Sequence, residues 1–234
     1  MPDIEELNAR FAGADPQDIL AFTLRSNAFG PVCVVSSFGT ESAVLLHMIS
    51  AIDARTPILF LETGKHFPET LAYRETLATA LGLRDVRDIS PDPELVAAKD
   101  EKGLRYTYDP DFCCELRKVK PLENALDAFE ATITGRKSHQ ATTRAALRPF
   151  EQDGTRHKIN PLAHWDRPAL KAYFREHDLP RHPLEAEGYL SIGCAPCTSK
   201  VLPGEDPRAG RWRQFGKIEC GIHTRLDSPG KRTL

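Results

Sequence analysis

Features that would place this chain in a membrane or on nucleic acid are missing from its sequence. No apolar run approaches the roughly 20 residues of a membrane-spanning helix, and the longest, residues 43–52, is interrupted by His47 and Ser50. The 31 basic and 33 acidic residues give a net charge of -2, so no excess of positive charge attracts a polyanion. We therefore expect a soluble protein that binds neither membrane nor nucleic acid and holds any anionic ligand by local contacts.

An export signal is also missing, because the N-terminal Met-Pro-Asp-Ile-Glu-Glu has no basic segment followed by an apolar core. We expect a cytoplasmic protein, in which the six cysteines stay reduced rather than form disulfides. The 234 residues contain no repeat or low-complexity segment and suffice for one main domain. We expect an α/β domain over residues 1–202 and a mobile tail over residues 203–234, where apolar periodicity ends.

Four of the cysteines form two pairs, the doublet Cys113-Cys114 and the Cys194-Ala-Pro-Cys197 motif. Four thiolates are the ligand set of structural zinc and of an iron-sulfur cluster. Zinc ribbons usually combine two Cys-x-x-Cys motifs. Two adjacent cysteines have little room to bind one small ion, but they can bind the larger cube of a four-iron cluster. The spacing favours a [4Fe-4S] cluster over zinc, with disulfides as a third alternative. Of the other two cysteines, Cys33 lies between valines and is expected in the core.

Short apolar segments at residues 31–35, 57–61 and 131–134, with a weaker one at 85–89, predict buried strands. Helices are expected from Asp15-Pro16, after Ser42, from Pro68, from Glu115 toward residue 129, and after Asp166. This alternation predicts a parallel sheet with helices on its faces. Ligands of such sheets bind beyond the carboxyl ends of the strands.

Three polar loops would emerge at those ends. The first, Ser36-Ser-Phe-Gly-Thr-Glu-Ser42, joins a strand to a helix N-terminus, where free N–H groups and the helix dipole attract a phosphate. The second begins at Glu62, and the third, residues 135–144, is cationic. An ordinary β-α connection and a solvated basic loop are the alternatives. Together the loops favour a site for an anionic ligand.

Six motifs, in order over roughly residues 31–223, resemble those of the assimilatory adenylyl-sulfate and phosphoadenylyl-sulfate reductases, the sulfonucleotide reductases. They are Ser36-Ser-Phe-Gly-Thr-Glu-Ser, Leu61-Glu-Thr-Gly, Cys113-Cys-Glu-Leu-Arg-Lys-Val, Gly188-Tyr-Leu-Ser-Ile-Gly-Cys-Ala-Pro-Cys-Thr, Glu205-Asp-Pro-Arg-Ala-Gly-Arg-Trp and Lys217-Ile-Glu-Cys-Gly-Ile-His. ATP pyrophosphatases share the first loop but typically carry Ser-Gly-Gly-x-Asp-Ser, which Phe38 and Glu41 do not match.

The resemblance implies an adenine nucleotide α-hydrolase-like (Rossmann-like) fold and reduction of activated sulfate to sulfite by thioredoxin or glutaredoxin. Family members with all four cysteines bind a [4Fe-4S] cluster and prefer adenosine 5'-phosphosulfate (APS), which releases AMP; enterobacterial-type members that use the 3'-phosphorylated nucleotide (PAPS) lack them. A PAPS reductase is the nearest alternative. An iron-sulfur or zinc protein that binds nucleic acid or senses redox state would not account for Cys220 or the nucleotide loop. We also expect a homo-oligomer.

The resemblance also implies residue roles: Cys220 as the nucleophile that becomes an S-sulfonate, Lys118 between cluster and substrate, and His223 in the tail that closes over the phosphosulfate. Lys217 and His223 flank Cys220 and are expected to lower its pKa by their positive charge. The family commonly has Thr-Gly-x-Arg-Arg where this chain has Lys137-Ser138, so of these two only Lys137 is carried over. The expected substrate-binding residues are Ser36, Phe38, Gly39, Thr40, Glu41, Ser42, Leu61, Glu62, Thr63, Gly64, Lys137, Arg208 and Arg211, and the expected cluster ligands are Cys113, Cys114, Cys194 and Cys197.

Overall fold

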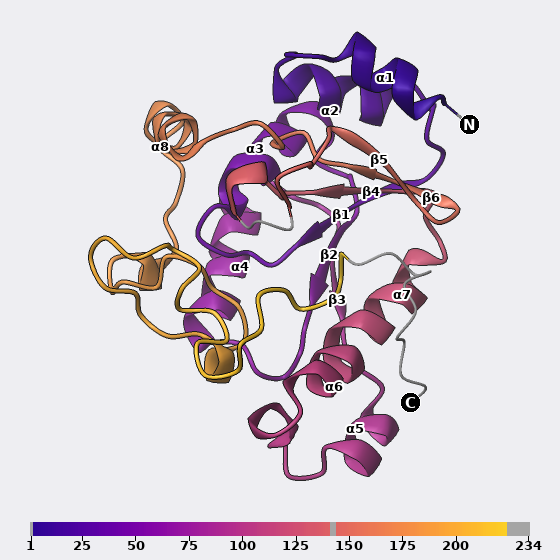
Figure 1. Cartoon of the computed structure of the whole chain (residues 1–234). Coiled ribbons are helices and arrows are strands. Elements are labelled where there is room, and N and C mark those ends of the chain that lie inside the picture. The colour runs from indigo at the N-terminus through magenta and orange to yellow at the C-terminus, as the bar shows by residue number, and fades with distance from the viewer. Residues whose placement is uncertain (1, 141–143, 224–234) are drawn as a thin grey trace.

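The computed structural model describes residues 2–140 and 144–223 and has a six-stranded sheet at its centre (Figure 1). The strand order is β3-β2-β1-β4-β6-β5, and all neighbours are parallel except β5 and β6, which form an antiparallel hairpin. The expected parallel sheet is confirmed, and the hairpin adds two strands that the apolar pattern did not predict. The strands are β1 Val32–Ser36, β2 Ile58–Leu61, β3 Val86–Ile89, β4 Ala131–Thr134, β5 Phe150–Asp153 and β6 Arg156–Ile159.

Most helices begin where proline and aspartate indicate. Proline lies in the first turn of α2, α4 and α8, where its missing N–H is not needed. Asp166 caps α8 by accepting a hydrogen bond from the N–H of Ala169, whereas the Asp15 side chain makes no such bond. The helices are α1 Ile4–Arg10, α2 Pro16–Arg25, α3 Ser42–Asp53, α4 Pro68–Ala80, α5 Pro93–Lys99, α6 Pro110–Cys114, α7 Lys120–Leu126 and α8 Arg167–Glu176.

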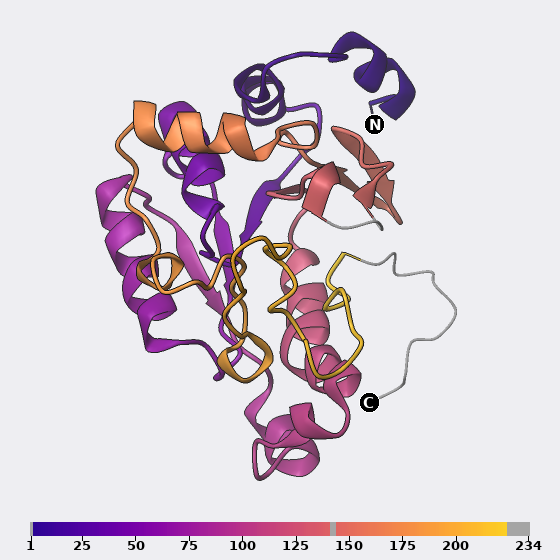
Figure 2. The same cartoon turned by 60° about the vertical axis from the view of Figure 1, so that its left-hand side comes forward.

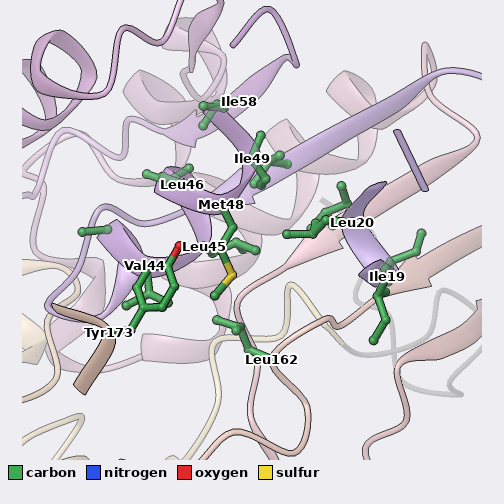
Figure 3. Packing of buried hydrophobic residues seen from close by; sticks show 14 of the residues in the cluster. Ile19, Leu20, Val44, Leu45, Leu46, Met48, Ile49, Ile58, Leu162 and Tyr173 are labelled. Carbon is green, nitrogen blue, oxygen red and sulfur yellow. The ribbon is translucent and has the colours of Figure 1, made fainter. Parts of the chain in front are cut away.

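Different helices cover the two faces of the sheet. Successive residues of a strand point to opposite faces, so neighbouring residues of β1 contact different helices. Val34 of β1 packs into a cluster with residues of α1 to α4 and α8, and its neighbour Cys33 packs on the other face with Leu122 of α7. Figure 3 shows part of the larger cluster, with Val44 of α3 against Tyr173 of α8. Cys33 is fully buried, as expected.

The helix after the cysteine doublet departs from the expected regular helix to residue 129. The turn η2, Glu115–Val119, is π-helical and joins α6 to α7, which ends at Leu126. A π turn holds one more residue than an α turn and rotates the side chains that follow it. It thereby sets the directions of Arg117 and Lys118.

Between α8 and residue 223 the chain forms loops with two short 3-10 turns, Pro183–Glu185 and Ala195–Cys197 (Figures 1 and 2). The described part of the expected tail is attached to the second cysteine motif, because Thr198 and Arg211 form a β-bridge and Trp212 donates its N–H to the carbonyl of Cys197. Residues 224–234 lie outside the described part, and the boundary at residue 202 stays a prediction. Within the described residues no helix has the length and apolarity to cross a membrane.

Candidate active site

A cavity of about 220 Å³ lies at the carboxyl ends of β1, β2 and β4, at the edge where the three polar loops were expected. Its wall combines those loops with residues 190–193 and with the tail between residues 207 and 223. Tail and nucleotide loop therefore meet around one space. The sequence-predicted residues that line it are Ser36, Gly39, Thr40, Glu41, Ser42, Leu61, Lys118, Lys137, Arg208, Arg211, Cys220 and His223.

Four expected substrate contacts do not line the cavity. Phe38 is 0% exposed and packs edge-on against Phe60, so its side chain anchors the loop after β1 to the core. Glu62 accepts a hydrogen bond from the N–H of Gly64 and closes its own turn. Thr63 is fully buried, with its hydroxyl 3.3 Å from the Cys194 sulfur. The side chains of Phe38, Glu62 and Thr63 therefore do not face this cavity, and a substrate contact through these residues or Gly64 stays a prediction.

The loop after β1 presents the N-terminus of α3 at the cavity wall. Glu41, the residue before the helix, makes no capping hydrogen bond, which leaves the N–H groups of the first turn without a side-chain acceptor. The Thr40 hydroxyl donates to the carbonyl of Leu190 at 3.0 Å and so connects this loop to the segment before Cys194. The arrangement suits an anion at the positive end of a 12-residue helix.

Glu41 itself is neutralised by the loop after β4. The Lys137 ammonium and the Gln140 amide each lie 2.8 Å from the same carboxylate oxygen. Burial favours the protonated form of Glu41, but Lys137 outweighs it and holds the pKa of Glu41 below its usual value. Lys137 is 2% exposed. Lys137 therefore forms a buried ion pair with Glu41 in the cavity wall, and its contact with substrate stays a prediction.

Arg144, at the end of the cationic loop, is a cavity residue that motif comparison did not single out. Its guanidinium donates to both carboxylate oxygens of Glu219, at 2.8 and 3.0 Å, and Arg208 approaches the same carboxylate at 3.4 Å. Arg136 of the same loop is likewise paired, with Glu151 at 2.5 Å. Only the basic character of the loop pointed to Arg144, whereas Arg136 was held in reserve when its motif was compared with that of the family.

Two cavity cations, Lys118 and Arg211, have no carboxylate partner among the described residues. Burial opposes the charge of Lys118, but the nearby thiols of Cys194 and Cys220 outweigh burial and raise its pKa. Arg211 lies over the Trp212 ring at 4.4 Å and donates to the carbonyl of Ile192. These two side chains are therefore the charges most available to an anion.

The structure brings the two cysteine motifs together. Cys113, Cys114 and Cys194 are buried and Cys197 is half-buried, and the Cys113 and Cys114 thiols both interact electrostatically with Cys194. Burial raises the pKa of Cys113 to about 12 and that of Cys114 to about 11. Burial also disfavours a Cys194 thiolate, yet Lys118 and the Thr63 hydroxyl outweigh it and lower its pKa. Within residues 2–140 and 144–223, no three His, Cys, Asp or Glu side chains are arranged to hold a metal ion, so the thiols do not form a compact single-ion site.

Cys220 is half-buried and shares the cavity wall with Lys118. The flanking charges differ from the sequence-based expectation. Lys217 pairs with Asp111 of α6. Burial, and then the surrounding cations Arg136, Lys158, Arg144 and Arg208, lower the pKa of His223 well below its usual value. His223 is therefore a neutral imidazole at neutral pH, and the expectation that it supplies positive charge is wrong.

The sequence and the fold both have known counterparts. The phosphoadenosine phosphosulfate reductase domain model matches residues 31–200. An adenosine 5'-phosphosulfate reductase of Chelativorans sp. is 48% identical over 219 residues, covering 93% of this chain and 89% of that protein. A phosphoadenosine 5'-phosphosulfate reductase of Gloeobacter violaceus is 40% identical over 226 residues, covering 94% and 93%. The crystal structure of phosphoadenylyl-sulfate reductase from Candida auris, a phosphate complex, superposes with a TM-score of 0.70 at 29% identity, covering 85% of this chain and 96% of that chain.

Proposed function

The chain belongs to the phosphoadenosine phosphosulfate reductase family, and we propose that it catalyses the assimilatory reduction of adenosine 5'-phosphosulfate to sulfite and AMP. The observation that carries the proposal is the position of Cys220. This half-buried thiol lies in the wall of a cavity at the carboxyl ends of three parallel strands, together with Lys118 and Arg211, which have no carboxylate partner among the described residues. A nucleophile and two cations around one space suit attack on an anionic acceptor.

In the first step the Cys220 thiolate attacks the sulfur of the phosphosulfate. A bond forms between the two sulfurs, the bond from sulfur to the bridging oxygen breaks, and AMP leaves with the electron pair. Lys118, Arg211 and the N-terminus of α3 offset the charge on the phosphosulfate in a site that is partly shielded from water. Neutral His223 can hold a hydrogen bond to an oxygen of the substrate without repelling the nearby arginines.

In the second step a dithiol of thioredoxin or glutaredoxin attacks the Cys220 sulfur of the S-sulfonate. Sulfite leaves, and the second thiol of the reductant resolves the mixed disulfide, returning Cys220 as a thiol. The dithiol loses two electrons and the sulfuryl sulfur gains them, so the step needs no further oxidant or reductant. This use of reduced thioredoxin agrees with a cytoplasmic enzyme.

The nucleotide without a 3'-phosphate is the better fit. Two cations of the loop after β4, Arg136 and Lys137, are each paired with a carboxylate and so are less available to an additional phosphate. The relatives named adenosine 5'-phosphosulfate reductase, one of them 48% identical, support the same choice. The 3'-phosphorylated nucleotide remains the second candidate because the Gloeobacter violaceus relative carries that name.

We also propose that Cys113, Cys114, Cys194 and Cys197 hold a [4Fe-4S] cluster. The chemistry of the donor set supports the proposal: the four thiols are free, three of them are buried, and Cys113 and Cys114 both interact electrostatically with Cys194 of the second segment. When bound, the cluster would tie α6 to the 194–197 turn and add its charge to the field around Lys118. Since thiol exchange moves electrons in pairs, the reaction does not require a one-electron carrier.

The function is tested by incubating anaerobically prepared protein with APS in the absence of reductant. We expect one equivalent of AMP and one S-sulfonate, which peptide mass spectrometry should place in the segment Lys217 to His223. Cys220→Ser should bind AMP as well as the unsubstituted protein does and form neither product. AMP release that survives this change, or an adduct on Cys33, would identify another nucleophile. A lower specificity constant for APS than for PAPS would favour the second candidate.

A further inference from the structure

The residue that precedes the nucleophile, Glu219, lies between arginines from two separate segments. Arg144, from the loop after β4, donates to its two oxygens at 2.8 and 3.0 Å across 75 residues of sequence. Arg208, from the start of the tail, is 3.4 Å away and also donates to the carbonyl of Ile218 at 3.0 Å. The Glu219 carboxylate therefore joins the tail to the body of the α/β domain next to Cys220.

The Arg144–Glu219 pair has the geometry of a strong contact. A bidentate guanidinium–carboxylate pair fixes both distance and orientation. The Arg144 side chain is only 9% exposed and that of Glu219 21%, and Gln140 accepts a further hydrogen bond from Arg144 at 2.6 Å. Removing one partner of a shielded pair costs considerably more than removing one partner of an exposed pair, because the remaining charge is left without compensation. Opening the tail means separating these two groups.

The other contacts of the same segment are weaker anchors. Lys217 pairs with Asp111, whose side chain is 76% exposed, and exposed pairs contribute little. Ile218 is 57% exposed and buries little surface. Ile222 packs partly against the small cluster around Leu61, which is the main apolar contact of the segment. Of the ion pairs that Lys217 and Glu219 make with the body of the domain, the one between Glu219 and Arg144 is therefore the more shielded.

We propose that Glu219 is a positioning residue: its ion pair with Arg144 and Arg208 latches the tail over the cavity and holds Cys220 beside Lys118. The inference rests on the proposed function only in naming sulfonation of Cys220 as the step that this ion pair accelerates. Because Glu219 offsets one of the two charges of Arg144 and Arg208, this group keeps one net positive charge, and Lys118 and Arg211 are the cavity cations without a carboxylate partner among the described residues. The latch therefore acts on the rate of sulfonation, and it must open before a reductant protein can reach Cys220.

The test uses Glu219→Gln, which keeps the size of the side chain and removes its charge, with Asp111→Asn as the matched control for the exposed pair. The first measurement is the rate at which iodoacetamide alkylates Cys220 in nucleotide-free, anaerobically prepared protein, read by peptide mass spectrometry. We expect Glu219→Gln to raise this rate about tenfold and Asp111→Asn to change it less than about threefold. Glu219→Asp, a shorter carboxylate, should restore part of the protection.

The second measurement separates binding from chemistry. Single-turnover sulfonation at saturating APS should slow at least tenfold in Glu219→Gln, while the Kd for AMP changes less than about threefold. An unchanged alkylation rate would overturn the latch. A Kd for AMP that tightens tenfold with sulfonation intact would show that the carboxylate competes with substrate, which also contradicts the proposal. Because alkylation needs no substrate, the latch can be judged even if the unsubstituted protein forms no adduct, an outcome that would refute the proposed function alone.

Discussion

Replacing Asp100 by alanine should reduce the free energy of unfolding by about 3–5 kcal/mol, because it leaves a buried arginine without its counterion. The Asp100 and Arg117 side chains are 2% and 9% exposed, and Arg117 donates to one oxygen of Asp100 at 3.0 and 2.8 Å. The other oxygen accepts the N–H of Arg105 at 2.8 Å. Charge-assisted hydrogen bonds contribute about 1.5–3 kcal/mol each, so losing the two bonds from Arg117 alone is consistent with that range.

The same substitution should loosen the cysteine site. Arg117 also donates to the carbonyl of Thr63 at 2.9 Å, and the Thr63 hydroxyl touches the Cys194 sulfur at 3.3 Å. A displaced Arg117 therefore disturbs one wall of the thiol arrangement. We expect Asp100→Ala to lose iron faster than the unsubstituted protein when both are held with a chelator.

The assay is urea unfolding of proteins prepared side by side under anaerobic conditions. Asp85→Ala is the control, because the Asp85–Arg87 pair lies on the surface with side chains 31% and 48% exposed and should contribute less than about 1 kcal/mol. If Asp100→Ala does not accumulate, Asp100→Asn keeps an acceptor for Arg105 while removing the charge, and a smaller loss of about 1–3 kcal/mol is expected. A loss below about 1 kcal/mol in Asp100→Ala would refute the reasoning.

Three further predictions concern the site and its pH dependence. Lys118→Ala should lower the rate of single-turnover sulfonation by about 100-fold, which is roughly the effect of losing one preorganised charge. Its iron content should be unchanged. Normal turnover in a variant with its full iron content would contradict this. Cys113→Ser or Cys194→Ser should abolish iron binding, measured by iron and sulfide assay, whereas Cys33→Ser, which changes a buried cysteine of β1 outside the four paired ones, should keep it. Burial lowers the pKa of His182 to about 4 in the folded protein, whereas its pKa in the unfolded chain is near 6.5. As the pH falls, the unfolded chain therefore binds the proton first. The free energy of unfolding should drop by about 2 kcal/mol between pH 7 and 5. His182→Gln should flatten that pH profile in chemical unfolding, and an unchanged slope would contradict the assignment.

Much of the fold could be predicted locally. The β-branched segment of β1, the proline-led starts of α4 and α8 and the Asp166 cap all depend on neighbours within a few residues. The β5–β6 hairpin had a signal of its own in Gly154, which takes a positive φ at the first position of the two-residue turn Gly154-Thr155, but its polar strands lack apolar alternation. The π turn at residues 115–119 has no comparable local signature.

Part of the candidate site could likewise be predicted from the sequence, and part could not. Motifs identified Cys220, Lys118, the four paired cysteines and the loop after β1, and parallel-sheet topology explains why residues of several loops share one edge. The orientation of Phe38 into the core and of Thr63 toward Cys194 was not predictable, because it depends on which neighbour fills the space around each side chain.

The amino-acid sequence by itself determined the family, the order of strands and helices along the chain, and which residue types are available for chemistry. Only the tertiary structure decided which charges remain available to a ligand. Lys137 is committed to Glu41 across 96 residues and Arg144 to Glu219 across 75, while Lys118 and Arg211 stay without a carboxylate partner among the described residues. The physical reason is that a charge is neutralised by whatever group lies within a few ångströms of it, and that distance is set by the packing of segments far apart in sequence.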